Sequence, residues 1–92
     1  MANILVVEDE ESVRELLRLY LEKEGFKVEL ASNGEEALDK MSRASPDLVL
    51  LDLMLPKKDG WEVCREIRKT SYVPIIMLTA RGEEFDKVLG LE

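Results

Sequence analysis

Apolar residues form short runs along the chain, and stretches with helical spacing separate these runs. The segments Asn3 to Val7, Asp47 to Leu51 and Ile75 to Leu78 are almost continuously apolar, as in strands buried on both faces of a parallel sheet. Lys27 to Leu30 alternates polar and apolar residues, which is typical of an edge strand. Because strands and helices alternate, the pattern predicts an α/β fold.

Four helices are expected between and after these strands. The first ends before Gly25, which is suited to the left-handed C′ position. The second begins with a capping box made by Ser32 and Glu35. The third follows a turn containing Asp59 and Gly60, and the fourth covers Gly82 to Leu91. The side chains expected to face inward are Val13, Leu16, Leu17, Tyr20, Leu21, Ala37, Leu38, Met41, Trp61, Cys64, Ile67, Phe85, Val88 and Leu89.

Right-handed crossovers between the four strands give a doubly wound parallel sheet in the order 2-1-3-4. The direction of winding changes between the first and third strands. Ligands of such sheets bind outside the carboxyl ends of the strands at this switch point. The residues that follow the first and third strands are therefore the candidates for function.

Acidic residues stand at both of these strand ends. Glu8 and Asp9 follow the first strand, Asp52 follows the third, and Thr79 is expected close by. Carboxylates repel one another, so such a cluster costs stability unless a cation lies among them. Oxygen ligands suit Mg²⁺, which is commonly bound by one or two carboxylates together with a phosphate. The arrangement predicts metal-assisted phosphoryl chemistry at Asp52.

A simpler interpretation is that Glu8, Asp9 and Glu10 are acids favoured by the dipole at the start of the first helix. We prefer the metal site because Asp52 is expected at the same edge of the sheet.

Composition limits the classes of function. The 92 residues predict one domain, and 20 acidic against 13 basic residues give a net charge of −7, which argues against direct nucleic-acid binding. The single Cys64 fits a reducing cytoplasm, and no apolar stretch reaches the roughly 20 residues of a membrane helix. The chain contains no His, so any phosphohistidine donor must be another protein.

Three groups of residues carry a resemblance to a known family. They are the run from Val6 to Glu10, the run from Leu50 to Pro56 with Asp59 and Gly60, and the run from Pro74 to Ala80. In order and spacing these motifs resemble the receiver domain of two-component response regulators, over the whole chain. The resemblance implies a flavodoxin-like fold.

The resemblance also implies a role for each matching residue. Asp52 would accept a phosphoryl group from a sensor histidine kinase, and the domain would be a phosphoacceptor with at most weak self-phosphorylation rather than an enzyme. Mg²⁺ would be bound by Glu8, Asp9, Asp52 and the backbone carbonyl of Met54. Thr79 would bond the phosphoryl group and report its arrival, and Ala80 would leave room for it.

The chain departs from the family pattern at its end. It stops at Glu92, so residues 1–92 are expected to form a truncated receiver that lacks the fifth strand, its lysine and the fifth helix. The strand from Ile75 to Leu78 would then be an exposed edge, and such edges pair with other chains. The alternative function is therefore a folded fragment that self-associates through this strand, with little or no phosphotransfer.

Two further classes fit the residues poorly. Phosphatases with an aspartate nucleophile need a second Asp two residues later, where this chain has Met54. Flavin-binding flavodoxins need a Ser/Thr/Gly-rich phosphate loop after the first strand, where Glu8 to Glu11 would repel phosphate.

Overall fold

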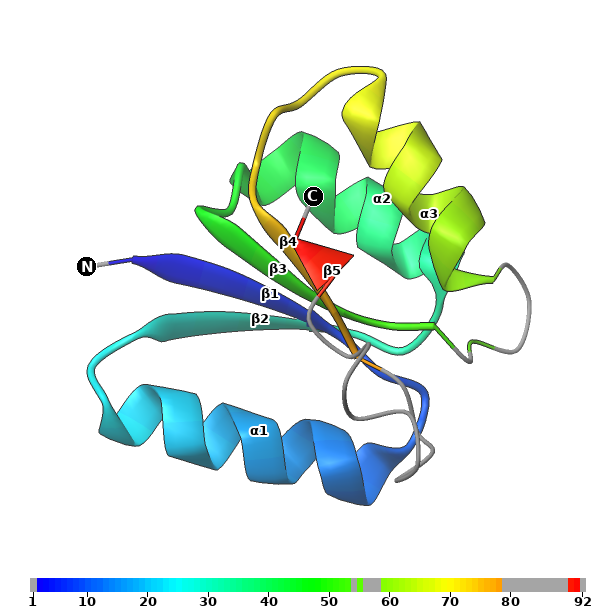
Figure 1. The fold of residues 1–92 in the computed structure, drawn as a ribbon. Coiled ribbons are helices and arrows are strands. Elements are labelled where there is room, and N and C mark those ends of the chain that lie inside the picture. Colours follow the sequence, from blue (N-terminus) through cyan, green and yellow to red (C-terminus); the bar gives the residue numbers. More distant parts are fainter. Residues whose placement is uncertain (1, 54, 56–58, 79–89, 92) are drawn as a thin grey trace.

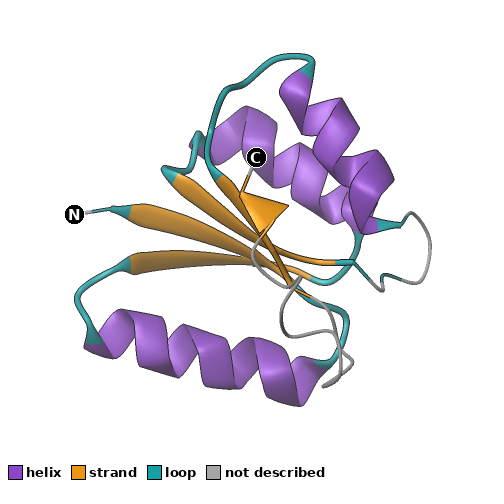
Figure 2. Cartoon of the chain, in the orientation of Figure 1, coloured by secondary structure: helices purple, strands orange, loops and turns teal. Residues whose placement is uncertain are grey.

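The computed structural model describes residues 2–53, 55, 59–78 and 90–91. Strands and helices alternate through most of this part (Figures 1 and 2). The strands are β1 (Asn3–Val7), β2 (Lys27–Ala31), β3 (Leu48–Asp52), β4 (Ile75–Leu78) and β5 (Gly90–Leu91). The helices are α1 (Glu11–Lys23), α2 (Gly34–Ala44) and α3 (Gly60–Arg68).

The sheet has the order β2-β1-β3-β4-β5, and its first four strands are parallel. The predicted order 2-1-3-4 and the edge position of β2 are therefore confirmed. Val7 of β1 is level with both Ala31 of β2 and Leu51 of β3. Because of this register, the residues that follow Val7 and Leu51 lie side by side at the carboxyl edge of the sheet.

The outer edge of β4 differs from the prediction. Ile76 and Met77 pair with Leu91 and Gly90 of the antiparallel strand β5. Gly90 and Leu91 are thus in a strand and not at the end of a helix, and β4 is not the outermost strand. The backbone groups on the free side of an apolar strand need partners, and β5 supplies them over two residue pairs. The rest of the predicted fourth helix, 82–89, lies outside the described residues.

Helices α2 and α3 cover one face of the sheet and pack against each other, whereas α1 lies on the opposite face (Figure 1). On the α2 and α3 side, Ala37, Cys64 and Ile67 are buried as predicted, and Leu38 and Met41 pack against the core. Trp61 remains half-exposed at the start of α3. In the part of the chain that is described, no helix has the length and apolar character needed to cross a bilayer.

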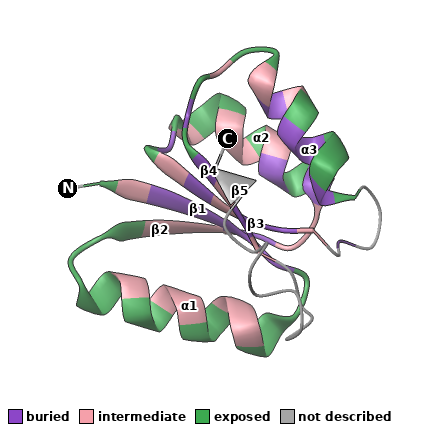
Figure 3. Ribbon diagram, viewed as in Figure 1, coloured by how far each residue is buried: buried purple, intermediate pink, exposed green. Residues whose placement is uncertain are grey.

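The apolar side of α1 is much less buried than predicted (Figure 3). Of its 13 residues, all described, none is buried, and Leu16 and Tyr20 are 53% and 63% exposed. The reason is that α1 is the only helix of the described residues on its face of the sheet. The apolar positions of α1 have the helical spacing that the sequence predicts. A single helix packed on β1 and β2, however, buries only part of its own apolar side.

Local signals determine where the helices begin and end. Gly25 has a φ of +95° directly after the C-cap residue of α1, as predicted. The capping box at α2 is one residue later than predicted, because Asn33 is the N-cap and accepts a hydrogen bond from the Glu36 backbone N–H. Glu36, and not Glu35, accepts from the backbone N–H and the hydroxyl of Ser32.

Gly60 allows α3 to start directly against the end of β3. Its N–H donates to the Leu53 carbonyl at 3.2 Å, while Asp59 caps the helix by accepting from the Glu62 N–H at 2.9 Å. A Cβ at position 60 would lie 2.7 Å from the Leu53 Cα and 2.8 Å from the Asp52 carbonyl oxygen. Backbone atoms cannot rotate away from such a contact, so only glycine fits here.

We therefore expect Gly60→Ala to lower the free energy of unfolding by about 1–3 kcal/mol, the usual cost of overpacking. Urea unfolding measures this loss, and the backbone amide shifts of Asp52 and Leu53 should move with it. Gly25→Ala is the control, since a Cβ there meets nothing within 4 Å and adds only the strain of the positive φ. Gly25→Ala should leave the Asp52 and Leu53 amides unmoved, and equal shifts in both variants would contradict the close-contact explanation.

Candidate functional site

The acidic residues predicted from the sequence meet at the carboxyl edge of the sheet. Glu8 follows Val7 of β1, and Asp52 follows Leu51 of β3, which is the paired residue on the neighbouring strand. The Glu8 N–H donates to the Ala31 carbonyl at 3.0 Å and extends the pairing of β1 with β2 by one residue. The parallel register therefore places Glu8 and Asp52 together at the switch point.

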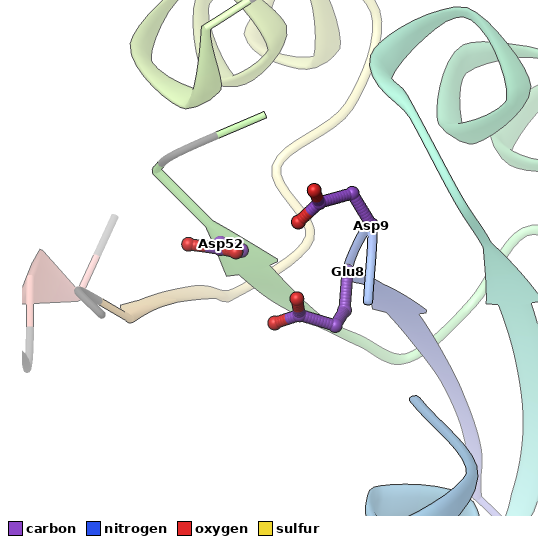
Figure 4. A group of neighbouring side chains, drawn as sticks. All are labelled: Glu8, Asp9 and Asp52. Carbon is purple, nitrogen blue, oxygen red and sulfur yellow. The ribbon is translucent and has the colours of Figure 1, made fainter. Parts of the chain in front are cut away.

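Asp9 completes a cluster of three carboxylates. One carboxylate oxygen each from Glu8, Asp9 and Asp52 lies within 4.8 Å of the others. The carboxyl groups of Glu8 and Asp9 point toward the side on which Asp52 lies (Figure 4). Glu8 and Asp52 are only 9% and 6% exposed, whereas Asp9 is exposed. The cluster therefore has a buried base and one side open to solvent.

This donor set fits Mg²⁺. Bonds of about 2.1 Å in octahedral geometry put neighbouring ligand oxygens about 3 Å apart and opposite ones about 4 Å apart. Three carboxylate oxygens within 4.8 Å of one another can reach such positions by small side-chain rotations. All the ligands are oxygens, which a hard divalent cation prefers. The residues present thus suit the cation that the sequence predicts.

The electrostatics of Glu8 show the cost of the cluster without a cation. Burial, above all, raises the pKa of Glu8, and together with the charge of Asp52 and hydrogen bonds with Asp52 and Asp9 it brings this pKa to about 7. The Glu10 N–H, 3.1 Å from the Glu8 carboxylate, opposes this rise by stabilising the charged form. Below about pH 7, Glu8 thus carries a proton, which removes one negative charge from the cluster.

Arg14 is a part of the site that the sequence analysis did not identify. Its Nη1 donates to the backbone carbonyls of Glu8 at 2.9 Å and Asp9 at 3.2 Å. The position of Arg14 near the start of the first predicted helix was one indication in the sequence. A cation near the start of a helix is disfavoured by the helix dipole, so an Arg there calls for another partner.

Thr79, Ala80 and Met54 lie outside the described residues. Their roles at the phosphoryl group and the metal remain predictions of the resemblance.

Comparison with known proteins identifies relatives of this arrangement. The family described as response regulator receiver domain matches residues 4–92. The alkaline phosphatase synthesis transcriptional regulatory protein PhoP of Bacillus subtilis is 59% identical over 90 residues, which are 97% of this chain and 38% of PhoP. The transcriptional regulatory protein ResD of the same organism is 56% identical over 89 residues, again 97% of this chain and 37% of ResD. The chain thus spans less than two fifths of either relative.

Solved structures agree with these matches. The response regulator TrrA from Thermotoga maritima, in complex with Mg²⁺ and BeF, superposes with a TM-score of 0.85 at 45% identity, over 96% of this chain and 77% of that one. The BeF3-activated receiver domain of Klebsiella pneumoniae RstA gives a TM-score of 0.83 at 39% identity, over 91% and 72% of the two chains. By sequence and by fold, this chain belongs to the response regulator receiver domain family.

Proposed function

We propose that Asp52 accepts a phosphoryl group from a sensor histidine kinase, with Mg²⁺ bound by Glu8, Asp9 and Asp52. The observation that carries this proposal is the meeting of three carboxylates within 4.8 Å where β1 and β3 end. The complex of TrrA with Mg²⁺ and BeF supports it, because a phosphoryl-like group and this cation occur together in a relative of the same fold.

The transfer begins with the Asp52 carboxylate as the nucleophile. One of its oxygens forms a bond to phosphorus while the bond between phosphorus and the kinase imidazole nitrogen breaks. That nitrogen leaves with the electron pair. Because this chain contains no His, the nitrogen belongs to the partner protein. When bound, Mg²⁺ supplies positive charge that offsets the charge on the equatorial phosphoryl oxygens.

The residues of this chain position the reacting groups. Asp52 is held at the end of a buried strand, so its carboxylate enters the reaction with little freedom to lose. We assign the phosphoryl contact to the Thr79 hydroxyl, the space beside it to Ala80, and a further metal ligand to the Met54 carbonyl. We also place the exchange in the cytoplasm, with no direct nucleic-acid contact by this strongly acidic segment.

The first test of this proposal is the mass of the intact protein after incubation with Mg²⁺ and a small acyl phosphate. We expect a gain of one phosphoryl group that disappears with a chelator or with Asp52→Asn. Asp59→Asn is a matched control, because it makes the same change at the exposed cap of α3. A gain that survives Asp52→Asn would place the phosphoryl group elsewhere, and no gain in a folded sample would refute the proposal.

The raised pKa of Glu8 predicts how stability depends on pH. Its folded pKa of about 7 lies above the ordinary 4.5, so the native state binds the extra proton and this contribution to stability is lost as pH rises through 7. From pH 5 to 8, without metal, the unfolding free energy should fall by about 2–3 kcal/mol relative to Glu8→Gln. Excess Mg²⁺ should remove this fall, because it binds the ionised cluster.

Urea unfolding across this pH range, with a chelator and then with Mg²⁺, measures both effects. Glu10→Gln is the control, since it removes a charge from the neighbouring exposed residue and should keep the fall. The same pH dependence in the Glu8→Gln variant would show that another group is responsible.

Self-association through β4 is the second candidate function. The observation that favours it is that, among the residues the structure describes, β5 pairs with two of the four residues of β4. We expect sedimentation velocity to show dimers or larger species at high concentration, and Leu78→Lys to abolish them. A wild-type monomer at all concentrations would exclude this candidate.

A further inference from the structure

One cationic side chain holds the turn that carries two of the three acids. Arg14 lies in α1, and its Nη1 reaches back to the carbonyls of Glu8 and Asp9 at 2.9 and 3.2 Å. A terminal guanidinium nitrogen carries two N–H groups, one for each carbonyl. The same nitrogen thus joins the backbones of two neighbouring residues whose side chains both belong to the cluster.

Within the turn, the Glu10 N–H donates to the Glu8 carboxylate at 3.1 Å, and two backbone hydrogen bonds hold its ends. The Glu8 N–H is bound to Ala31 of β2, and the Arg14 N–H is bound to the Glu10 carbonyl at the start of α1. Asp9 lies between these ties and is exposed, so packing does little to fix it. The Arg14 side chain supplies the hydrogen bond at this middle position.

The positive charge of Arg14 lies next to the backbone of the cluster residues. It contacts carbonyl oxygens and not the carboxylates, so it does not occupy a position that a cation would take. Hydrogen bonds from Ser32 are the main reason that the pKa of Glu36, on the neighbouring loop, is lowered, and the charge of Arg14 adds to this effect. Arg14 thus lies where the loops after β1 and β2 meet.

We propose that Arg14 is a positioning residue for the cation site, which it serves by fixing the Glu8 and Asp9 backbones so that their carboxylates converge on Asp52. This inference rests on the proposed function, because it assumes that the cluster binds Mg²⁺. It assigns Arg14 neither a metal bond nor a contact with the phosphoryl group.

The test compares two arginines on the same helix. Arg14→Met removes the two hydrogen bonds, whereas Arg18→Met removes the same charge from a residue that pairs with Glu15 and Glu22. Calorimetric titration with Mg²⁺ should show about tenfold weaker binding for Arg14→Met, as for other residues that orient metal ligands. Arg18→Met should bind within twofold of the wild type. Equal weakening in both variants would reduce the effect to net charge and overturn the proposal.

Arg14→Lys separates position from charge, and it serves also if Arg14→Met does not fold. Lysine keeps the charge on a shorter side chain without the planar fork, so it does not replace arginine where one group bonds two acceptors. We expect Mg²⁺ binding to be more than twofold weaker in Arg14→Lys. Binding within twofold of the wild type would show that charge alone is sufficient, and the positioning role would be wrong.

A second readout does not need the metal. The backbone carbonyl ¹³C shifts of Glu8 and Asp9 in metal-free protein should move in Arg14→Met and stay in place in Arg18→Met. Unmoved shifts would overturn the proposal. Failure of the wild type to bind Mg²⁺ or to be phosphorylated would instead remove the proposed function, and with it the role given to Arg14. A wild type that binds, with Arg14→Met equal to it, removes this inference alone.

Discussion

The repulsion among three carboxylates governs the arrangement of this receiver domain. Parallel pairing of β1 with β3 in the Val7–Leu51 register brings Glu8 and Asp52 together, and the short turn after β1 adds Asp9. Burial of Glu8, above all, and the charge of Asp52 raise the pKa of Glu8 to about 7. The surrounding structure keeps this costly cluster assembled by backbone pairing at Ala31 and by the Arg14 side chain. In the proposed function, a divalent cation would offset this repulsion among the carboxylates.

The elements that the sequence predicted well depend on short-range rules. β1 and β4 have the predicted bounds because their apolar runs are continuous, and the acids that follow β1 and β3 could be assigned to one edge from topology alone. The predicted capping box was wrong by one residue, because Ser32 and Asn33 are both suitable N-cap residues for the same helix. The exposure of α1 and the formation of β5 depend on which elements lie beside them. The spacing of apolar residues within a segment does not reveal those neighbours. Arg14 was missed for the same reason, because its partners are backbone carbonyls.

The two faces of the sheet differ in how they are covered. On one face α2 and α3 pack against each other and bury a continuous apolar core with β1, β3 and β4. On the other, α1 alone leaves Leu16 and Tyr20 more than half exposed. The acidic site lies at the edge shared by both faces. The turn with Asp9 leads into α1 on the loosely covered side.

The backbone contact at Gly60 couples the movement of α3 to that of the end of β3. Its N–H meets the Leu53 carbonyl, and its Cα lies so close to Asp52 and Leu53 that no side chain separates α3 from the end of β3. A contact between two backbones has no rotatable side chain that could absorb a displacement, and close-packed protein is hardly compressible. The end of β3 and the first turn of α3 therefore move together as one rigid unit. If Asp52 accepts a phosphoryl group as proposed, a small shift there would tilt the helix as a whole, and its far end would travel further than the aspartate itself.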